Sequence, residues 1–580
     1  MTTSPPGVHR AASTGLPRPT TVPAAGGRRV SPRPVAVLIA LSAAIAGCSP
    51  RDAIRSPGED AATVGTVTLL AINDVYRIEG VDGGTVGGLA RVRSLRQDLE
   101  RDHPELLLLH AGDFLYPSLL SDTYDGAQMV DLMNRLDGDP GGFDARMVVT
   151  FGNHEFEKQR LAQASLLEER IRESQFTWLG SDLEWATGED GAAAVEAPNL
   201  VRSTTIESNG LRVGIFSVST DERHPEYVER FSDRALVTRR LSQALRDAGA
   251  DLVIALTHLP APEDLALMEA TALDGPDLVI GGHEHARTAE QSTDGRWLLK
   301  ADADARSATL VRLTLRADGS VDTLHEFLDL GPAVEPDADA AQRTRWWLDR
   351  HQAEYCAERD EGAGCLDVVV GTTSVRLLAE ENHIRRFETN LGNWVADRAR
   401  ELFPDAEVAL INAGSLRLNQ DIPAGPIRVR VLEELFAYPN KLVALTVDAA
   451  TLRAALLRSV ENWTGSGAFL QVSGIAFRFD PQATGDQRVR DITLLDRGAP
   501  LREGDEVTVV TWDFLHGGGD DYTMWTEIAP RTLDLDFAQH IRQLLESQDE
   551  PIAPTVEGRI CNLSEATALE PCLAMPRDQR

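Results

Sequence analysis

Basic residues are scarce in this chain of 580 residues, which holds 57 Lys and Arg against 90 Asp and Glu and so carries a formal net charge of -33. A protein this acidic repels other polyanions, and the composition therefore argues against a nucleic-acid polymer as a partner. A site that binds a small anion must then carry positive charge of its own.

Acidic residues are missing from the first 47 positions, which hold five arginines and then a short apolar run at 35–41. The run is too short to span a bilayer, and no other segment is long and apolar enough to do so. It leads into Ile45-Ala46-Gly47-Cys48, which resembles a bacterial lipobox. We therefore expect export, lipidation of Cys48 and a lipid-anchored protein of the bacterial cell envelope, in the periplasm or on the outer surface. An ordinary signal peptide with an incidental Cys is the alternative.

Cysteine is also rare, and no CxxC pair is present. Apart from Cys48 there are two local pairs, Cys356 with Cys365 and Cys561 with Cys572. A disulfide within each pair is the simplest interpretation and fits an exported protein, but the spacing alone leaves the connectivity open. A zinc site is the alternative, which the lack of a CxxC motif disfavours.

No short internal repeat organises the chain. Instead, short apolar runs, each ending in a polar cluster, alternate with helix-like stretches, which predicts an α/β fold with largely buried strands. The first set of runs lies at 66–72, 106–109, 147–151, 211–217, 252–257 and 278–280. A connecting helix is predicted over 337–354. A second alternating region extends from 368 to about 556, with helices predicted at 390–403 and 449–460 and strands at 407–411, 442–447, 474–479 and 506–511.

Five of the first runs lead directly into residue types that bind metal ions. In open α/β sheets ligands bind beyond the carboxyl ends of the strands, so the five clusters predict one shared site. One cluster alone would fit a structural turn or a structural histidine, whereas five in succession indicate a metal centre. The clusters are Asn73-Asp74-Val75-Tyr76, Gly112-Asp113, Gly152-Asn153-His154-Glu155, Thr257-His258 and Gly281-Gly282-His283-Glu284-His285.

In these motifs the sequence resembles the calcineurin-like metallophosphoesterases, and among them the two-domain 5′-nucleotidase family that includes UDP-sugar hydrolases, over about residues 66–556. The resemblance implies a four-layer β-sandwich flanked by helices, a helical linker and a smaller α/β domain that supplies the nucleotide pocket. The expected segments are a lipoprotein signal at 1–48, a tether at 49–63, the metallophosphoesterase domain at 64–335, the linker at 336–365, the substrate domain at 366–560 and a tail at 561–580.

The resemblance also implies two divalent metal ions, zinc, manganese or iron, bridged by Asp113. Asp74 and His285 would hold the first ion, and the second would be held by Asn153, His258 and His283. Carboxylates and imidazoles suit these metals, and water bound to such an ion ionises at a pKa of about 7. Two divalent ions less two carboxylates leave a charge of about +2, enough to attract a phosphate to an acidic protein.

His154 would stabilise the charge that develops on the phosphoryl group or protonate the leaving oxygen, with a structural histidine as the alternative. Glu157 stands where the family usually has an Asp and is expected to orient His154. Tyr76 stands where the family usually has a His, and because a neutral phenol is a poor zinc ligand, the first metal site is expected to be weakened or lost. Residues 112–116 also match the GDxxY motif of purple acid phosphatases, which leaves a ferric site with Tyr116 as an alternative to simple packing of that ring.

Motifs in the second region resemble the substrate domain of the family. Arg385 and Arg417 would bind phosphate or the substrate tail through their guanidinium groups. No arginine stands within 380–382, where the family has another one. Tyr438 and Phe514 would stack on the two faces of the base, with core packing as the alternative for each ring. The base or ribose would also be met by Asn440, Gly467 and Asp520.

Together these features predict a metal-dependent enzyme of the cell envelope that hydrolyses phosphate esters of nucleotides, foremost nucleoside 5′-monophosphates. Nucleotide sugars, cyclic nucleotides and NAD-type pyrophosphates are alternative substrates on the same fold. A nucleotide-binding lipoprotein with weak activity is the alternative from another functional class, prompted by Tyr76 and by the missing arginine. The expected partners are a small nucleotide and, through the lipid anchor, the membrane; no protein partner is evident from the sequence.

Overall fold

The computed structural model describes residues 61–188, 191–461, 463 and 466–564, all of which belong to one unit of the chain, Asp60–Arg580. The predicted signal with Cys48, most of the predicted tether and Cys572 lie outside the described residues. Within the described ranges, no helix has the length and apolar character needed to cross a membrane.

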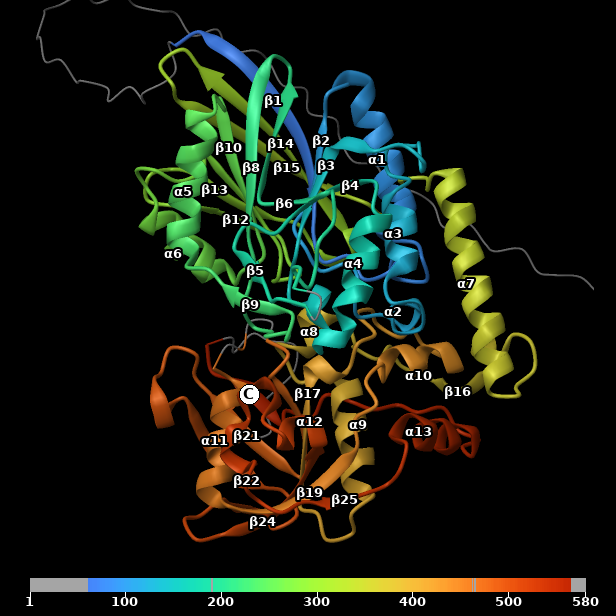
Figure 1. Ribbon diagram of the computed structural model, residues 1–580. Coiled ribbons are helices and arrows are strands. Elements are labelled where there is room, and N and C mark those ends of the chain that lie inside the picture. Colours follow the sequence, from blue (N-terminus) through green and yellow to red (C-terminus); the bar gives the residue numbers. More distant parts are fainter. Residues whose placement is uncertain (1–60, 189–190, 462, 464–465, 565–580) are drawn as a thin grey trace, which may run out of the picture. The chain divides into compact units, whose positions relative to one another are not determined.

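Two β-sheets form the N-terminal region (Figure 1). The apolar runs of the sequence become strands, and β1 to β4 pair in parallel because helices connect them. The seven strands of the first sheet are, in spatial order, β15 (Val321–Asp329), β14 (Ser307–Arg316), β1 (Thr63–Ile72), β2 (Leu107–His110), β3 (Asp144–Thr150), β4 (Phe176–Leu179) and β6 (Leu200–Val201).

The second sheet has a parallel centre, in which β10 pairs with both β8 and β11, and β11 pairs with β13. Antiparallel strands close both edges. Its six strands are, in spatial order, β12 (Thr288–Gln291), β13 (Trp297–Lys300), β11 (Leu278–Gly281), β10 (Leu252–Thr257), β8 (Leu211–Val218) and β7 (Ser203–Ser208).

The N-terminal region has three hydrophobic cores. Neighbouring residues of one strand contribute to different cores, because successive residues of a strand point to opposite faces. Leu69 of β1 lies in the core between the two sheets together with Ile254 of β10, whereas Leu70 packs in the core formed with the helices. Helices cover the outer face of each sheet, and Figure 1 shows the two groups on opposite sides. The four-layer α/β sandwich is therefore confirmed. The helices are α1 (Leu89–Asp102), α3 (Ala127–Met133) and α4 (Ala164–Glu173) on the first sheet, and α5 (Arg234–Asp247) and α6 (Ala261–Ala270) on the second.

The predicted connecting helix is α7 (Ala338–Glu358). Asp337 caps its first turn by accepting hydrogen bonds from two backbone N–H groups, which such a helix end otherwise leaves unpaired. Its last turn is tied to the following segment by the disulfide Cys356–Cys365, so this predicted bond is confirmed. The proposed Cys561–Cys572 bond stays a prediction.

A five-stranded sheet forms the centre of the C-terminal region. Ala409 and Leu410 of β17 lie in separate cores on its two faces, which are covered by α9 (Asn390–Glu401) and α11 (Ala449–Ser459) respectively. The two predicted helices and three of the four predicted strands are found here, and the fourth, predicted at 474–479, is β21 (Ile475–Phe479) of another sheet, so all are confirmed. The strands of the sheet are, in order, β20 (Leu470–Ser473), β17 (Val408–Asn412), β24 (Glu506–Trp512), β19 (Leu442–Asp448) and β25 (Arg531–Thr532).

Smaller sheets and short helices complete the described chain. A four-stranded sheet has the order β23 (Ala499–Pro500), β22 (Val489–Leu494), β21 (Ile475–Phe479) and β26 (Ile560–Asn562), and two pairs are formed by β16 (Val369–Thr373) with β18 (Gly425–Arg428) and by β5 (Leu183–Trp185) with β9 (Val228–Phe231). The remaining α-helices are α2 (Leu119–Tyr124), α8 (Glu381–Ile384), α10 (Val429–Leu435), α12 (Asp513–His516) and α13 (Phe537–Glu546), and short 3-10 helices lie between other elements.

Candidate metal centre and substrate site

The five strand-end motifs meet at one site that two sheets share. The ends of β1 and β2 are in register at Ile72 and His110, and those of β10 and β11 are in register in the other sheet. A hydrogen bond joins the sheets at this point, where Nδ1 of His258 donates to the carbonyl oxygen of Ala111 at 2.6 Å. The carboxyl ends of parallel strands from both sheets therefore face the same site.

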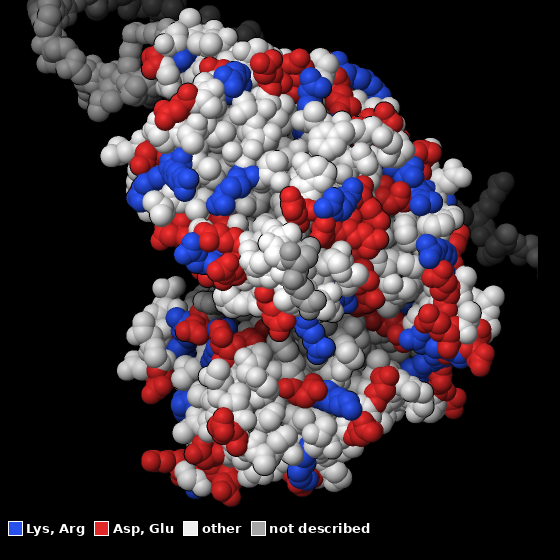
Figure 2. All heavy atoms as spheres, viewed as in Figure 1, with Lys and Arg blue, Asp and Glu red and all other residues white. Residues whose placement is uncertain are grey.

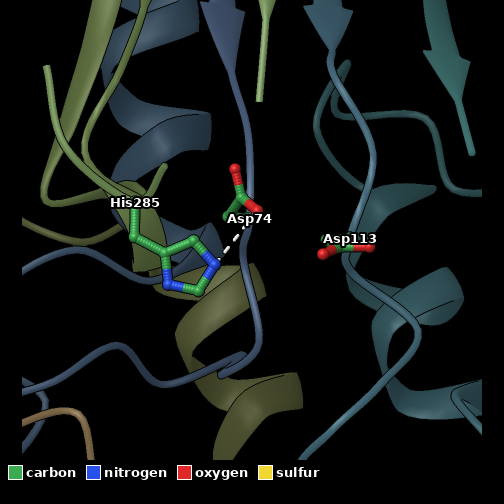
Figure 3. Close-up of side chains that lie close together, drawn as sticks. All are labelled: Asp74, Asp113 and His285. Atoms are coloured by element: carbon green, nitrogen blue, oxygen red, sulfur yellow. Dashed lines mark ion pairs between the residues drawn. The ribbon is translucent and has the colours of Figure 1, made fainter. Parts of the chain in front are cut away.

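Asp74, Asp113 and His285 form the centre of this site (Figure 3). One ligand atom from each residue lies within 4.8 Å of the other two, and all three side chains are buried. Nε2 of His285 is 3.2 Å from Oδ1 of Asp74. Two buried carboxylates held this close repel each other, so the arrangement requires a positive charge between or beside them.

The other three predicted ligands surround this centre. Nε2 of His258 lies 3.1 Å from Oδ2 of Asp113, and the rings of His258 and His283 are 5.4 Å apart. Asn153 is buried, and its side-chain oxygen finds no hydrogen-bond partner in the part of the chain that the structure describes. The preceding Gly152 packs so tightly that a Cβ there would lie 2.2 Å from Oδ1 of Asp113. The structure thus brings all six residues together.

The backbone of the site adopts a conformation that side chains disfavour. Positive φ angles occur at Asp74 (53°), Asp113 (61°), His283 (89°) and His285 (58°), four of the six predicted ligands. Non-glycine residues rarely adopt such angles, which cost roughly 1 kcal/mol or more each. Strain of this kind persists where function needs the side chains to converge.

The electrostatics of the cluster fit bound cations. Burial alone would raise the pKa of Asp74, but the charges of His285 and His258 outweigh it and lower that pKa to about 2. Burial lowers the pKa of His258, yet the carboxylates of Asp113 and Asp74 raise it to about 10. The carboxylates therefore demand positive charge, which protonated histidines supply here and which divalent ions would supply instead. With the unpaired oxygen of Asn153, the donor set is one that zinc, manganese or iron accepts.

His154 lies beside this cluster and is held by Glu157. Its backbone N–H donates to Oδ1 of Asp113 at 2.7 Å, and its ring Nδ1 donates to Glu157 at 2.6 Å. The carboxylate of Glu157 also accepts a hydrogen bond from Arg223 at 2.8 Å. Burial lowers the pKa of His154, against the opposing effects of Asp113 and Glu157. The other ring nitrogen, Nε2, has no hydrogen-bond partner among the described residues and can meet a substrate.

Glu155 is a residue whose role the sequence reasoning missed. Its buried carboxylate accepts hydrogen bonds from four backbone N–H groups, those of Gly152, Asp113, Phe114 and Leu115, at 2.6 to 3.1 Å. Burial raises the pKa of Glu155 to about 7. Glu155 thereby fixes two ligand loops against each other. The sequence offered one signal for this role, which is that Glu155 is a carboxylate within the Gly152-Asn153-His154-Glu155 motif at the end of a strand.

The two tyrosines near the cluster differ in their contacts. The hydroxyl of Tyr76 lies 2.8 Å from Nε2 of His285 and 3.2 Å from Oδ2 of Asp113. Burial, followed by the charge of Asp113, raises the pKa of Tyr76 well above its usual value, so the phenol is neutral. Tyr116 instead donates its hydroxyl hydrogen to Asp125 and packs in the core beneath the helices, which supports the packing interpretation of that ring.

Arg417 is the predicted substrate residue that lies next to the centre. Its guanidinium group stacks over the ring of Tyr76 at 5.7 Å, and its Nη2 has no hydrogen-bond partner among the residues described. Arg385 forms an ion pair with Glu381, a residue to which the sequence reasoning assigned no role. Figure 2 shows acidic side chains spread over the visible face with basic ones between them.

The residues predicted to bind the base lie around two segments of the C-terminal region. Two hydrogen bonds join Lys441 to Asp513, one between the backbones and one from the Lys441 N–H to the Asp513 carboxylate. They place Tyr438 and Asn440 beside α12, which carries Phe514 with 45% of its surface exposed. Asn412 donates to Asp520 at 2.8 Å, and the N–H of Gly414 donates to Gly467 at 2.8 Å. An exposed aromatic ring beside polar groups offers a surface on which a base can stack.

Comparisons with known proteins agree with this geometry. The family model of the calcineurin-like phosphoesterases matches residues 67–287, and that of the 5′-nucleotidase C-terminal domain matches residues 369–527. The two matches confirm the two-domain organisation, whereas the segment boundaries stay predictions.

Relatives are similar over most of this chain. It is 26% identical over 497 residues to the trifunctional nucleotide phosphoesterase protein YfkN of Bacillus subtilis, covering 78% of this chain but only 32% of that protein. It is 24% identical over 552 residues to a 5′-nucleotidase of Diplobatis ommata, covering 87% and 91% of the two chains. The fold matches that of a 5′-nucleotidase precursor from Thermus thermophilus with a TM-score of 0.72 and 24% identity, over 86% of this chain and 100% of the other.

Proposed function

Because this chain belongs to the two-domain 5′-nucleotidase family of calcineurin-like metallophosphoesterases and is a phosphoester hydrolase, we propose that it removes phosphate from nucleoside 5′-monophosphates with the help of two divalent metal ions. The observation that carries the proposal is the burial of Asp74, Asp113 and His285 within 4.8 Å of one another. Asn153, His258 and His283 complete the proposed ligand set.

The proposed reaction uses the two metal ions and the residues beside them. When bound, the two ions would polarise the phosphate and supply a hydroxide nucleophile near neutral pH. The Glu157 carboxylate holds His154 through Nδ1. An anionic phosphate next to the ring would offset the cost of burying a charged imidazole, so that Nε2 carries the proton needed by the leaving oxygen. Arg417 would bind the phosphate through its unpaired Nη2.

Base recognition falls to the C-terminal region in this proposal. Phe514 and Tyr438 would stack on the base, and Asn440, Gly467 and Asp520 would contact the base or ribose. Stacking tolerates every base because each presents a π face. A broader set of nucleotide phosphoesters is the second candidate, and the similarity to a trifunctional nucleotide phosphoesterase favours it.

Phosphate release tests the function directly. Purified protein supplied with Mn²⁺ or Zn²⁺ should release phosphate from AMP, and Asp113→Asn should abolish this release, whereas Asp102→Asn, which changes an exposed carboxylate at the end of α1, should not. UDP-glucose and a 2′,3′-cyclic nucleotide, assayed alongside, distinguish the second candidate. Saturable AMP binding without turnover under every metal would overturn the hydrolase and favour the nucleotide-binding lipoprotein.

The proposed location is the cell envelope, with the protein anchored through a lipid on Cys48. The lipobox-like motif supports this, as does the Cys356–Cys365 disulfide, because such bonds persist in oxidising compartments. Metabolic labelling with palmitate should mark the wild type but not Cys48→Ala, and the variant should leave the membrane fraction. An unlabelled wild type would support the ordinary signal peptide instead.

A further inference from the structure

Glu381 connects the C-terminal region to the candidate metal centre. It begins α8, and its side chain is buried. One carboxylate oxygen, Oε2, accepts a hydrogen bond from Nδ1 of His285, and the other, Oε1, pairs with Arg385. The opposite ring nitrogen of His285, Nε2, faces Oδ1 of Asp74 at 3.2 Å and the hydroxyl of Tyr76 at 2.8 Å.

This contact determines which nitrogen of His285 can bind a metal. A carboxylate can only accept, so the hydrogen of the neutral ring must lie on Nδ1, which leaves the lone pair of Nε2 directed at the cluster. A carboxylate on the far side of a ligating imidazole also holds the ring plane and makes the ligating nitrogen more basic. Both effects strengthen the bond from that nitrogen to a cation.

The first of the two proposed ions depends strongly on His285. From the N-terminal region it is offered Asp74, the shared Asp113 and His285, and the group beside them is the phenol of Tyr76, a poorer metal donor than an imidazole or a carboxylate. A metal site with few strong donors loses more of its affinity for the ion when one donor is misaligned. The support given to His285 therefore has a large effect on this ion.

We propose that Glu381 is a positioning residue that orients His285 for the first metal ion, so that this metal site is completed by the C-terminal region. The inference rests on the metal-binding part of the proposed function. Arg385 pairs with the same carboxylate. The residue that supports the metal ligand and a candidate phosphate-binding residue therefore lie at the two ends of the single turn of α8.

Metal binding without substrate tests this role. Wild type, Glu381→Ala and Glu381→Gln are equilibrated with free Mn²⁺ or Zn²⁺ set by a graded chelator series, and bound metal is counted by mass spectrometry. We expect Glu381→Ala to need about 10- to 100-fold more free metal to fill one of two sites, with the other unchanged. Glu381→Gln should shift less, because its amide oxygen can still accept from Nδ1.

Two further variants separate positioning from general damage. Glu380→Gln alters the neighbouring carboxylate, which contacts Asn382 rather than the cluster, and should bind both ions as the wild type does. Arg385→Gln breaks the ion pair but leaves the contact of Glu381 with His285, so its metal binding should not weaken. Unfolding temperatures at saturating metal establish that each variant is folded.

Three results would overturn the proposal. The first is equal retention of both ions by Glu381→Ala. The second is equal weakening of both ions, which indicates a general structural role. The third is a loss in Arg385→Gln as large as that in Glu381→Ala, which assigns the effect to the ion pair. A wild type that binds two ions but hydrolyses no nucleotide would refute the proposed function. The metal affinities of the wild type and the Glu381 variants could still be compared in that case. A wild type that binds no ion would refute both.

Discussion

The hydroxyl oxygen of Tyr76 lies 2.8 Å from Nε2 of His285, inside the cluster of candidate metal ligands. The same ring lies beneath the guanidinium group of Arg417, at 5.7 Å. Tyr76 therefore joins the proposed metal site to the proposed phosphate site. Its neutral hydroxyl stabilises the carboxylates by hydrogen bonding, but it supplies a weak donor to a metal ion.

Replacing Tyr76 by His should strengthen the first metal site, because an imidazole nitrogen is a far better donor for zinc or manganese than a phenol. We expect about tenfold or tighter binding of the weaker ion in chelator-buffered titrations. Tyr76→Phe keeps the ring beneath Arg417 and removes only the hydroxyl, so it should gain no affinity. Equal affinities in wild type and Tyr76→His would show that position 76 does not reach the ion.

His154 should matter most for substrates whose leaving group is a poor one. Removing a general acid costs typically about 10²- to 10⁴-fold in rate, so His154→Ala should lower kcat for AMP within that range. An aryl phosphate with an acidic phenol needs no protonation, and its hydrolysis should fall much less. Glu157→Gln, which retains an acceptor for Nδ1, should lose less activity than Glu157→Ala. Equal losses on both substrates would assign His154 to charge stabilisation instead.

Phe514 should contribute to the affinity for the base and not to the chemistry. Stacking contributes about 1–3 kcal/mol per base, so Phe514→Ala should raise KM for AMP by about 5- to 150-fold with kcat nearly unchanged. Ribose 5-phosphate carries no base and is the matched control, since its KM should be the same in both proteins. A lower kcat with an unchanged KM would contradict the stacking role.

The sequence predicted the elements of the fold and the main members of the site for a physical reason. Buried strands need continuous apolar runs, and the polar residues directly after such runs must lie at sheet edges, which is how Asp74, Asp113 and His258 were found. These inferences use local patterns only. They placed the candidate ligands at one shared site without any knowledge of the order of the strands in the two sheets.

The supporting residues could not be predicted because their roles depend on contacts between distant segments. Glu381 lies 96 positions from His285, and Arg223 lies 66 positions from Glu157. No spacing rule relates such pairs, since their meeting depends on how the sheets and the C-terminal region pack. Glu155 belongs to one of the predicted strand-end motifs, but its four backbone partners come from two loops that only the fold brings together.

The disulfide between Cys356 and Cys365 should stabilise the joint between α7 and the C-terminal region. It closes a loop with a sequence separation of nine, and a loop of this length corresponds to about 2–3 kcal/mol of lost entropy in the unfolded chain. We expect the double variant Cys356→Ala/Cys365→Ala to unfold at a lower temperature in calorimetry. A reducing agent should lower the unfolding temperature of the wild type by more than that of the variant, because only the wild type has this bond to lose. The same unfolding temperature in both proteins would show that packing alone holds this joint.

His351 of α7 should make the protein less stable in mild acid. The side chain is 1% exposed, and neither ring nitrogen has a hydrogen-bond partner within the described residues. Burial, reinforced by the charge of Arg430, lowers the pKa of His351 to about 4. The unfolded chain would take up a proton below about pH 6.5, whereas the folded protein would do so only near pH 4.

Stability contributed by a neutral His351 is therefore complete above pH 6.5 and declines as the pH falls to 4, by at most about 3 kcal/mol. His351→Phe removes the titrating group and keeps an aromatic ring against Tyr124 and Tyr355, each 6.0 Å away. Denaturant unfolding at a series of pH values should show a shallower fall for the variant between pH 6.5 and 4, and parallel behaviour at higher pH. If both proteins lose stability with the same slope across that pH range, groups other than His351 account for the loss of stability in acid.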